Sequence, residues 1–538
     1  MHPHRLRAPS SDGALLADPP LDLAGEALRS NADRLDRWEY DFQGRRAGRL
    51  RSMARAQVMA LAKRHHETFG LDWPDVPSQP ERLVVTGHQP ELFHPGVWVK
   101  NFAVAGLATA GGESGVGLNL IVDNDIPKGP TIRVPHREGD GLRVSPVAFD
   151  VWAGEVPYED QTVQDEALFA SFADRARATL GGLVADPMLD DFWPRVMRRA
   201  GETDRVGLRF ALARREVEAE WGARNVEVPL GLVCESEAFY WFASHLLAHL
   251  PRFQSTHNAA LARYRAAYGI RSKHHPVPAL GRQGEWLEAP FWAWRAESPR
   301  RRPLMVRLLP RTIELRIGGE DETIAELPLA ADRDACCAIE RFQELPGRGI
   351  RLRTRALTTT MFARYLLGDL FVHGIGGAKY DELGDELARE FFHFEPPRFL
   401  TLSLTHWLGV ESDPATLDRL RAVERSLRDL DWNPDRHLPE PRPAEARAAV
   451  EAKWVAIEGE VLTRRQRLDR LKGIRTANAA LAPWTEAARS RLLEERDRLR
   501  EGLKLNAVAR SREYAFPLHG RARLKGVMSR IYDEAAGR

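Results

Sequence analysis

Apolar runs and polar loops alternate near the start of the chain in the order expected for an α/β protein. Residues 83–86 form a short β-branched run, a polar loop follows at 87–90, and residues 97–110 have helical character. The next apolar run, 118–122, ends in an acidic loop at 123–125. Strand, loop, helix and strand in this order predict a βαβ unit of a parallel sheet, with both polar loops at its carboxyl edge.

The same periodicities predict the remaining elements of the core and its insertions. Helices are expected at 22–68, 164–222, 237–250, 257–268, 358–370 and 379–392. A β-hairpin is expected at 131–160, a third core strand at 226–233, a β-meander at 285–316, and late strands at 350–355, 371–373 and 399–404.

The C-terminal part has a different pattern. Apolar side chains recur there at heptad spacing, which is typical of a coiled coil. The first helix of this seam carries Val450, Trp454, Ile457, Val461, Leu468 and Leu471, and a second helix carries Leu492, Leu499 and Leu503. Pro483 predicts a break between them. We therefore expect an antiparallel coiled-coil hairpin.

Composition narrows the class of protein. Hydrophobic residues make up 43% of the 538 positions and charged residues 29%, the balance of a folded chain. The net charge is +2, so nothing favours bulk attraction to nucleic acid or to a membrane surface. The N-terminus lacks the apolar core of a signal peptide, and no apolar run approaches the ~18 residues that span a bilayer. The three cysteines suit neither a disulfide framework nor a zinc site. We expect a cytoplasmic protein without nucleic-acid or membrane partners.

These patterns divide the chain into a core interrupted by insertions. We expect a loose N-terminus at 1–20, the first part of the core with N-terminal helices at 21–130, an insertion at 131–225, core again at 226–270, a β-rich insertion at 271–349, the last core strands at 350–440, the coiled-coil hairpin at 441–512 and a C-terminal segment at 513–538.

The loop after the first predicted strand carries groups suited to a substrate. Gly87 lets the backbone turn closely past a ligand, and His88 and Gln89 can donate to an anionic or acyl group beside the following helix. The alternative is a structural turn in which His88 caps a backbone group. His88 and His94 lack a third partner, so no metal bound by these side chains is expected.

The loop after the second predicted strand is Asp123-Asn124-Asp125. Carboxylates at a strand end can hold Mg²⁺, orient an amine or act as a base. An Asx turn is the alternative, because the same residues favour it.

A third loop is rich in glycine. Gly374, Gly376 and Gly377 lie between a predicted strand and a helix, which is the chemistry of an anion cradle. Lys379 stands at the helix start, where a cation opposes the helix dipole unless an anion binds beside it, and Tyr380 follows directly. A tight turn is the alternative.

Three arginines alternate on the predicted strand at 350–355. Arg351, Arg353 and Arg355 place their guanidinium groups on one face, which either lines a substrate cleft or forms a solvated edge.

Four segments in order resemble the BshC family, the cysteine-adding ligases of bacillithiol biosynthesis. Residues 85–93 (VTGHQPELF) are similar to the family's T-G-Q-Q-A-G-L-F loop, and the loop 123–125 is placed like its E-D-H-D loop. Residues 353–355 and 371–380 are similar to its R-P-L-x-Q run and its G-G-P-G-E-I-A-Y segment. The arginine-rich hairpin and residues 512–517 complete the likeness. His88 stands where the family has Gln, and Lys379 near its Glu.

The resemblance implies a Rossmann-like parallel-sheet core, related to class I aminoacyl-tRNA synthetases and nucleotidyltransferases, with two inserted connecting regions. It also implies a coiled coil that pairs two subunits into a homodimer. The implied chemistry is a ligase reaction that joins the carboxylate of cysteine to the amine of glucosaminyl-malate, an amino-sugar acceptor. The cofactor stays open, with ATP or ADP and magnesium as one option.

The resulting hypothesis is a BshC-like ligase or transferase for small polar metabolites. The first loop and the third loop would bind the anionic or acyl group, and Arg355 would clamp a carboxylate. Asp123 and Asp125 would hold the amine or a metal. One alternative is a nucleotidyltransferase or ATP-dependent adenylating enzyme of the same fold. Another is a non-catalytic dimer scaffold. The residues expected at the site are Gly87, His88, Gln89, Asp123, Asn124, Asp125, Arg355, Gly376, Gly377, Lys379 and Tyr380.

Overall fold

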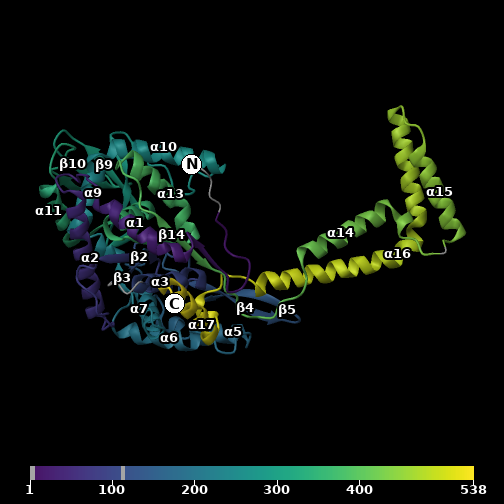
Figure 1. The fold of residues 1–538 in the computed structure, drawn as a ribbon, viewed down its shortest axis with the longest axis horizontal. Coiled ribbons are helices and arrows are strands. Elements are labelled where there is room, and N and C mark those ends of the chain that lie inside the picture. Colours follow the sequence, from purple (N-terminus) through teal and green to yellow (C-terminus); the bar gives the residue numbers. More distant parts are fainter. Residues whose placement is uncertain (1–5, 111–114, 441) are drawn as a thin grey trace. The chain divides into compact units, whose positions relative to one another are not determined.

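The computed structural model describes residues 6–110, 115–440 and 442–538. Two compact units make up the chain: unit 1 comprises Met1–Val134, Ser145–Leu408 and Arg512–Arg538, and unit 2 comprises Pro135–Val144 and Gly409–Ser511. The fold is mixed α/β, and its elements are labelled in Figure 1. Within the described ranges, no helix is both long and apolar enough to cross a membrane.

Unit 1 is built on a six-stranded sheet with the strand order β1-β14-β13-β2-β3-β6. The strands are β1 (Leu15–Asp18), β2 (Arg82–His88), β3 (Gly115–Ile121), β6 (Val226–Pro229), β13 (Leu370–His373) and β14 (Phe399–Leu404). All neighbours pair in parallel except β1, which is antiparallel to β14. The predicted parallel sheet is confirmed, and the predicted βαβ unit is present as β2, α3 (Pro95–Thr109) and β3.

Helices cover both faces of this sheet, which explains why its strands read as nearly continuous apolar runs. On one face, α3 (Pro95–Thr109) contacts β2, β3 and β14, and α17 (Arg521–Ala536) lies against α3. On the other face, Leu83 and Val85 of β2 share a buried cluster with Leu50 of α2 (Ala47–Thr68). Side chains of a strand alternate between the two faces, so Val84, Thr86 and His88 lie on the side of α3.

The direction in which the sheet grows reverses between β2 and β13. The chain passes from β2 to β3 and on to β6 at one edge, and later returns to add β13 and β14 on the other side of β2. In open parallel sheets such a reversal leaves a crevice outside the carboxyl ends of the two strands, where ligands bind. The ends of β2 and β13 are Gly87-His88 and His373.

A second sheet of unit 1 is antiparallel, with the order β11-β10-β9-β8-β12 and β7 paired with β8. Its strands are β7 (Arg282–Gln283), β8 (Trp286–Arg295), β9 (Ser298–Leu308), β10 (Ile313–Ile317), β11 (Thr323–Leu327) and β12 (Ile350–Thr354). The predicted meander at 285–316 is present as β8, β9 and β10. The strand predicted at 350–355 as part of the core forms, but it pairs with β8. Alternating arginines do not fit inside a parallel sheet buried on both faces.

Several predicted boundaries also shift. Residues 15–18, within the segment expected to be loose, form β1 and extend the sheet at β14, while residues 1–5 lie outside the described residues. The strand predicted at 226–233 ends at Pro229, where α8 (Leu230–Val233) begins. Proline suits this helix start because its fixed backbone angle and missing donor do not continue the ladder. The predicted hairpin forms from β4 (Thr131–Glu138) and β5 (Gly141–Ala148).

The other helices of unit 1 surround the two sheets. They are α1 (Ala24–Asp36), α4 (Glu166–Ala170), α5 (Phe172–Leu180), α6 (Leu189–Arg198), α7 (Val206–Glu220), α9 (Glu237–Ala248), α10 (Leu250–Tyr268), α11 (Cys336–Glu344), α12 (Ala356–Phe362) and α13 (Ile375–Glu390). The predicted helical regions are therefore present, although 22–68 is divided between α1 and α2.

Unit 2 differs from the predicted two-helix hairpin. It contains α14 (Leu417–Trp432), α15 (Ala444–Glu458) and α16 (Arg464–Ala509). The predicted break at Pro483 is wrong, because α16 continues through it. Figure 1 shows α16 bent partway along, as expected when a proline removes one helical hydrogen bond without ending the helix. The turn lies instead at residues 459–463.

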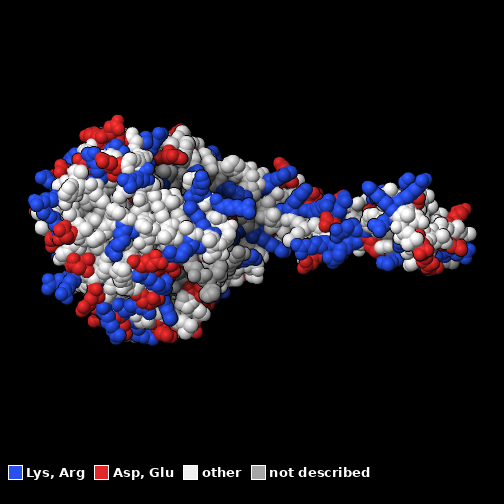
Figure 2. Space-filling model, turned by 90° about the horizontal axis from the view of Figure 1, so that it is seen from above, with Lys and Arg blue, Asp and Glu red and all other residues white. Residues whose placement is uncertain are grey.

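The bend gives the two parts of α16 different partners. α15 and α14 both contact α16. Leu499, with Leu492 and Leu503 beside it, packs against Val423 of α14. The leucines of the predicted second helix therefore face α14, and not the helix at 444–458. Figure 2 shows basic and acidic side chains mixed over the visible surface of these helices.

Candidate functional site

A cavity of about 920 Å³ lies over the carboxyl ends of β2 and β13, and it is lined by nearly every residue expected from the sequence. Those residues are Gly87, His88, Gln89, Asn124, Asp125, Arg355, Gly376, Gly377, Lys379 and Tyr380. Asp123 is the exception, because it lines a smaller cavity of about 200 Å³. The three predicted loops thus converge on one space in unit 1, and the volume suits a ligand of metabolite size.

His88 faces this cavity with both ring nitrogens against oxygen atoms of the protein. Its Nε2 lies 3.0 Å from Asn101 Oδ1, and its Nδ1 lies 3.2 Å from the carbonyl oxygen of Gln89. The amide nitrogen of Asn101 donates to Glu218 at 2.7 Å, so its Oδ1 accepts from His88. Burial holds the pKa of His88 well below its usual value, and a neutral ring makes only one of these two bonds. The imidazole is therefore fixed in place by the protein.

The acidic loop is occupied by protein partners as well. Asp125 accepts from Gln89 Nε2 at 2.8 Å and forms an ion pair with Arg301 at 2.9 Å. Asn124 donates through Nδ2 to the carbonyl oxygen of Thr354 at 2.9 Å. Arg301 had no counterpart among the expected residues. Because Arg301 pairs with Asp125 and Gln89 donates to it, the carboxylate of Asp125 is already occupied by protein groups and holds the side chain of Gln89 in place.

Arg355 also lines the larger cavity. Its guanidinium stacks 4.1 Å from the ring centroid of Trp292 and pairs with Glu288 at 2.7 Å. Glu288 neutralises most of this charge, so Arg355 is a weaker clamp for a ligand carboxylate than the sequence suggested. The aromatic ring and the planar cation together form a flat surface.

The glycine loop opens α13, with Gly374 at the position before the first helical residue. Ala378 donates to the carbonyl oxygen of Gly374 at 3.0 Å, so the amides of 375–377 precede the first helical bond and can receive an anion. A Cβ at Gly377 would lie 2.6 Å from His373 Nδ1, whereas Gly376 has nothing within 4 Å. Lys379 is exposed at the cavity rim, and burial raises the pKa of Tyr380.

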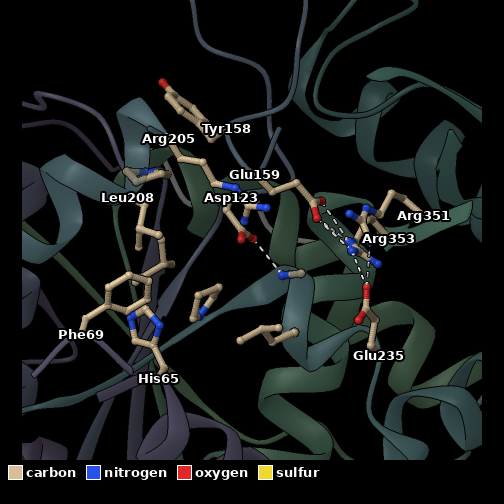
Figure 3. A pocket seen from close by; sticks show the side chains of 15 residues that line it. His65, Phe69, Asp123, Tyr158, Glu159, Arg205, Leu208, Glu235, Arg351 and Arg353 are labelled. Carbon is tan, nitrogen blue, oxygen red and sulfur yellow. Dashed lines mark hydrogen bonds and ion pairs between the residues drawn. The ribbon is translucent and has the colours of Figure 1, made fainter. Parts of the chain in front are cut away.

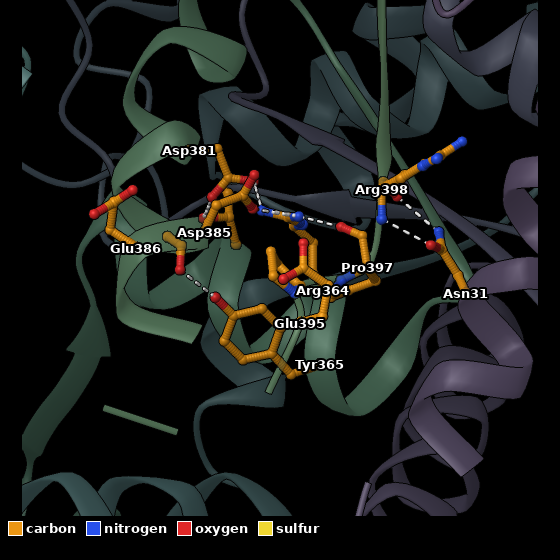
Figure 4. Close-up of polar contacts among 12 residues, drawn as sticks. Asn31, Arg364, Tyr365, Asp381, Asp385, Glu386, Glu395, Pro397 and Arg398 are labelled. Carbon is orange, nitrogen blue, oxygen red and sulfur yellow. Dashed lines mark hydrogen bonds and ion pairs between the residues drawn. The ribbon is translucent and has the colours of Figure 1, made fainter. Parts of the chain in front are cut away.

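His373 is a candidate that the sequence reasoning did not single out. It ends β13, lines the cavity, and lies with Nε2 2.7 Å from Asp381 Oδ2. Asp381 also accepts from Arg364 at 2.7 Å and from Thr360 at 2.7 Å. Figure 4 shows Arg364 reaching between Asp381, Asp385 and the backbone at Pro397.

The charges around His373 define its protonation. Arg364 and His373 hold the pKa of Asp381 well below its usual value, so this group is a carboxylate. Burial lowers the pKa of His373, so the ring is neutral near pH 7. A carboxylate accepts the proton of Nε2, which leaves the lone pair on Nδ1, the nitrogen beside Gly377. The signal in the sequence was a histidine just before a glycine turn, with an aspartate eight residues later.

Lys100 is the second residue that the sequence reasoning missed. It lies in α3, is 4% exposed, lines the cavity, and donates from Nζ to the carbonyl oxygen of Gly87 at 3.1 Å. Burial lowers its pKa to about 8. Across the described ranges no carboxylate pairs with it. Lys100 and Asn101 interrupt an otherwise apolar stretch at 97–108, and this interruption was the available signal.

Asp123 points away from Asp125 into the smaller cavity. Its Oδ1 accepts from the amide of Gly231 at 2.8 Å. Burial, and the neighbouring carboxylate of Glu159, raise the pKa of Asp123 to about 7. Residues 123–125 form a turn, and this turn directs Asp123 and Asp125 into different cavities. In the part of the chain that the structure describes, no three His, Cys, Asp or Glu side chains are grouped to hold a metal ion.

The fold and the cavity define an α/β protein with a polar, cation-lined pocket at the reversal point of a parallel sheet. No protein-family model matches the chain, and no curated protein matches its sequence.

Proposed function

We propose that the chain is an enzyme that joins an acyl group to an amine, with the 920 Å³ cavity as its active site. The observation that carries the proposal is Lys100, a buried ammonium at this cavity that donates to the carbonyl oxygen of Gly87 and pairs with no carboxylate of the described residues. A buried charge without a counter-charge is costly, and an anionic substrate would supply that counter-charge. The amides at the start of α13 offer the same anion a second group of donors.

His373 supplies the proton acceptor. In the proposed step the amine nitrogen attacks an activated carboxyl carbon and the carbon–nitrogen bond forms. The bond from that carbon to its leaving oxygen breaks, and the electron pair stays on the leaving oxygen, beside Lys100. The proton lost by the amine passes to His373 Nδ1. Asp381 keeps the ring in the tautomer that accepts it.

The resemblance to the BshC family gives this proposal its substrates. The acyl group would come from cysteine or a similar amino acid, and the amine from an amino-sugar acceptor in low-molecular-weight thiol biosynthesis. Counting only the parallel strands, the order 3-2-1-4-5 is that of doubly wound sheets, which supports a Rossmann-like core. The carboxyl group needs an activating group, for which a nucleoside triphosphate is the proposed co-substrate.

A nucleotide-binding enzyme that adenylates its substrate is the second candidate. The volume of the cavity and the flat surface of Trp292 with Arg355 favour it, because a purine ring needs both space and an aromatic face. A scaffold without catalysis is favoured less, since polar groups converge in the cavity.

We also propose that unit 2 pairs two copies of the chain. Its helices and the turn between α15 and α16 expose large apolar side chains, which a partner surface would cover. These are Leu417, Trp432, Trp454, Val455, Leu462, Leu468 and Leu471.

The test of the reaction uses the purified chain with cysteine, glucosaminyl-malate and ATP, with mass spectrometry of the products. The proposal predicts the amide product with the wild-type chain and with Lys63→Met, a substitution of an exposed lysine. Lys100→Met should abolish it. ADP as the nucleotide product would indicate that the carboxylate is activated by phosphorylation, and AMP would indicate activation by adenylation. Absence of both amide and nucleotide turnover with the wild-type chain would contradict the proposal.

A further inference from the structure

The smaller cavity, of about 200 Å³, is lined by both polar and apolar side chains. The apolar part comes from Phe69, Pro90, Ile121, Leu208, Pro229 and Leu232. Figure 3 shows His65 and Phe69 on one side and Arg353 with Glu235 on the other, with Asp123 between them. The cavity belongs wholly to unit 1 and has no role in the reaction proposed above.

Most charges in this cavity already neutralise one another. Arg353 is 2% exposed and binds Glu159 at 2.8 Å and Glu235 at 2.8 Å. Arg351 approaches Glu235 at 3.5 Å. Two carboxylates and two guanidinium groups therefore form one network along one wall.

Asp123 stays outside this network. Its Oδ1 accepts a hydrogen bond from the backbone amide of Gly231. Among the described residues Asp123 has no ion-pair partner. A Cβ at Gly231 would lie 3.3 Å from Asp123 Oδ2 and 2.9 Å from Glu159 Oε2, so both carboxylates approach this glycine. Asp123 is thus the carboxylate in the cavity that lacks a cation of its own.

A second group points independently to a ligand. His65 is 4% exposed and lines the cavity, and its Nε2 has no hydrogen-bond partner within the described residues. Burial lowers its pKa to about 4, so the ring is neutral near pH 7. A buried polar atom without a partner is costly, and a ligand would relieve that cost.

We infer that this cavity is a separate binding site for a small primary amine, whose ammonium group pairs with Asp123 and whose apolar body lies among Phe69, Leu208 and Leu232. The small volume excludes a nucleotide, and the neutralised wall disfavours a phosphate. Arg205 lies at the rim, and its guanidinium has no ion pair with any described residue, so it can bind a carboxylate if the amine carries one. Two sources share this chemistry: a free amine and an α-amino acid.

The two cavities share a wall. Asp123 and Arg353 line the smaller cavity, whereas Asn124, Asp125 and Arg355 line the larger one. An occupant of the smaller cavity therefore contacts the same two backbone segments that shape the larger one. The inference stands whether or not the larger cavity performs the proposed reaction.

The test is calorimetric titration of the full chain near pH 8 with four probes of one shape: isobutylamine, L-valine, 3-methylbutanoate and isobutanol. We expect the two amines to bind and the acid and the alcohol not to bind. Asp123→Asn should weaken amine binding by about ten-fold or more, because a charged hydrogen bond is lost. If valine binds more tightly than isobutylamine, and Arg205→Ala removes this difference, the ligand of the smaller cavity is an α-amino acid. Equal affinity identifies a free amine.

Matched variants keep the test specific. Arg198→Ala removes an exposed arginine that lines neither cavity and should leave binding unchanged. Lys100→Met changes the larger cavity and should also leave amine binding unchanged. Circular dichroism shows whether Asp123→Asn folds, and His65→Phe provides a second variant that should weaken binding. No binding of either amine, equal binding of the acid, or loss of amine binding in Lys100→Met would overturn the inference.

Discussion

The side chain of His373 lies with Nε2 2.7 Å from Asp381 Oδ2, at the carboxyl end of β13. This bond places the remaining lone pair of the imidazole beside Gly377, on the wall of the larger cavity. His373 ends β13 and Asp381 lies in the helix that follows, α13, where Arg364 holds the aspartate in place. A base oriented in this way is the arrangement that general base catalysis requires.

Replacing His373 tests this role. His373→Asn should lower the rate of amide formation by about 10²–10⁴-fold, because the proton acceptor is lost. His274→Asn is the control, since His274 is exposed and does not line the cavity. Single-turnover rates of both variants, measured from pH 6 to pH 9, give the comparison. A rate for His373→Asn equal to that of the control would remove His373 from the mechanism.

Two neighbouring glycines offer a matched pair of substitutions. Gly377→Ala places a Cβ 2.6 Å from His373 Nδ1, so the ring must move, whereas Gly376→Ala meets nothing within 4 Å. We expect Gly377→Ala to lower activity by about ten-fold or more while Gly376→Ala stays near the wild-type rate. Thermal unfolding should show a loss of only about 1–2 kcal/mol for Gly377→Ala, the size of a local repacking cost. Equal activity in the two variants would show that the position of the ring does not matter.

Asp123 should give unit 1 a characteristic dependence on pH. Its pKa is raised from 3.8 to about 7, so the folded chain holds a proton there that the unfolded chain releases above pH 4. The contribution of this group to the free energy of unfolding is therefore present below pH 4 and is lost as pH rises towards 7. Urea unfolding of the wild type and of Asp123→Asn from pH 4 to pH 8 measures the difference. A wild-type stability that does not fall relative to the variant over this range would contradict the pKa.

Pairing of two copies through unit 2 depends on its exposed apolar side chains. Val455 is 68% exposed and Leu462 75% exposed. Replacing both with Glu should convert a dimer into a monomer in light scattering after gel filtration, because two charges would be buried at the interface. Arg465→Glu, at an exposed position nearby, is the control, because it adds negative charge without removing an apolar side chain and should leave the dimer intact. A monomeric wild-type chain at micromolar concentration would end this proposal.

The sequence was a good guide to the loops at the strand ends and a poorer guide to the site residues and bends that lie elsewhere. Apolar runs at 83–86 and 118–122, followed by polar loops, are strong local signals, and the loops do converge on one cavity. The convergence follows from parallel pairing alone, because the carboxyl ends of parallel strands lie at one edge.

Other features depend on tertiary context that local patterns do not contain. Lys100 appears as one polar residue in an apolar helix, and only the packing of α3 against the sheet shows that it is buried without a carboxylate partner among the described residues. Arg355 lies just beyond the end of β12, so it leaves the face shared by Arg351 and Arg353 and lines the other cavity. Pro483 bends α16 instead of ending it, because α14 and α15 each support one part of the helix.

The central claim is that Lys100 prepares the larger cavity for an anion. Sulfate is a suitable probe because its charge does not change near neutral pH, and His88 and His373, whose pKa values are lowered by burial, stay neutral in the same range. Because the pKa of Lys100 is about 8, titration calorimetry should show sulfate binding weakened by about ten-fold between pH 7 and pH 9. It should be absent in Lys100→Met and unchanged in Lys63→Met. Sulfate binding that survives in Lys100→Met, or that does not occur in the wild-type chain at pH 7, would contradict the account.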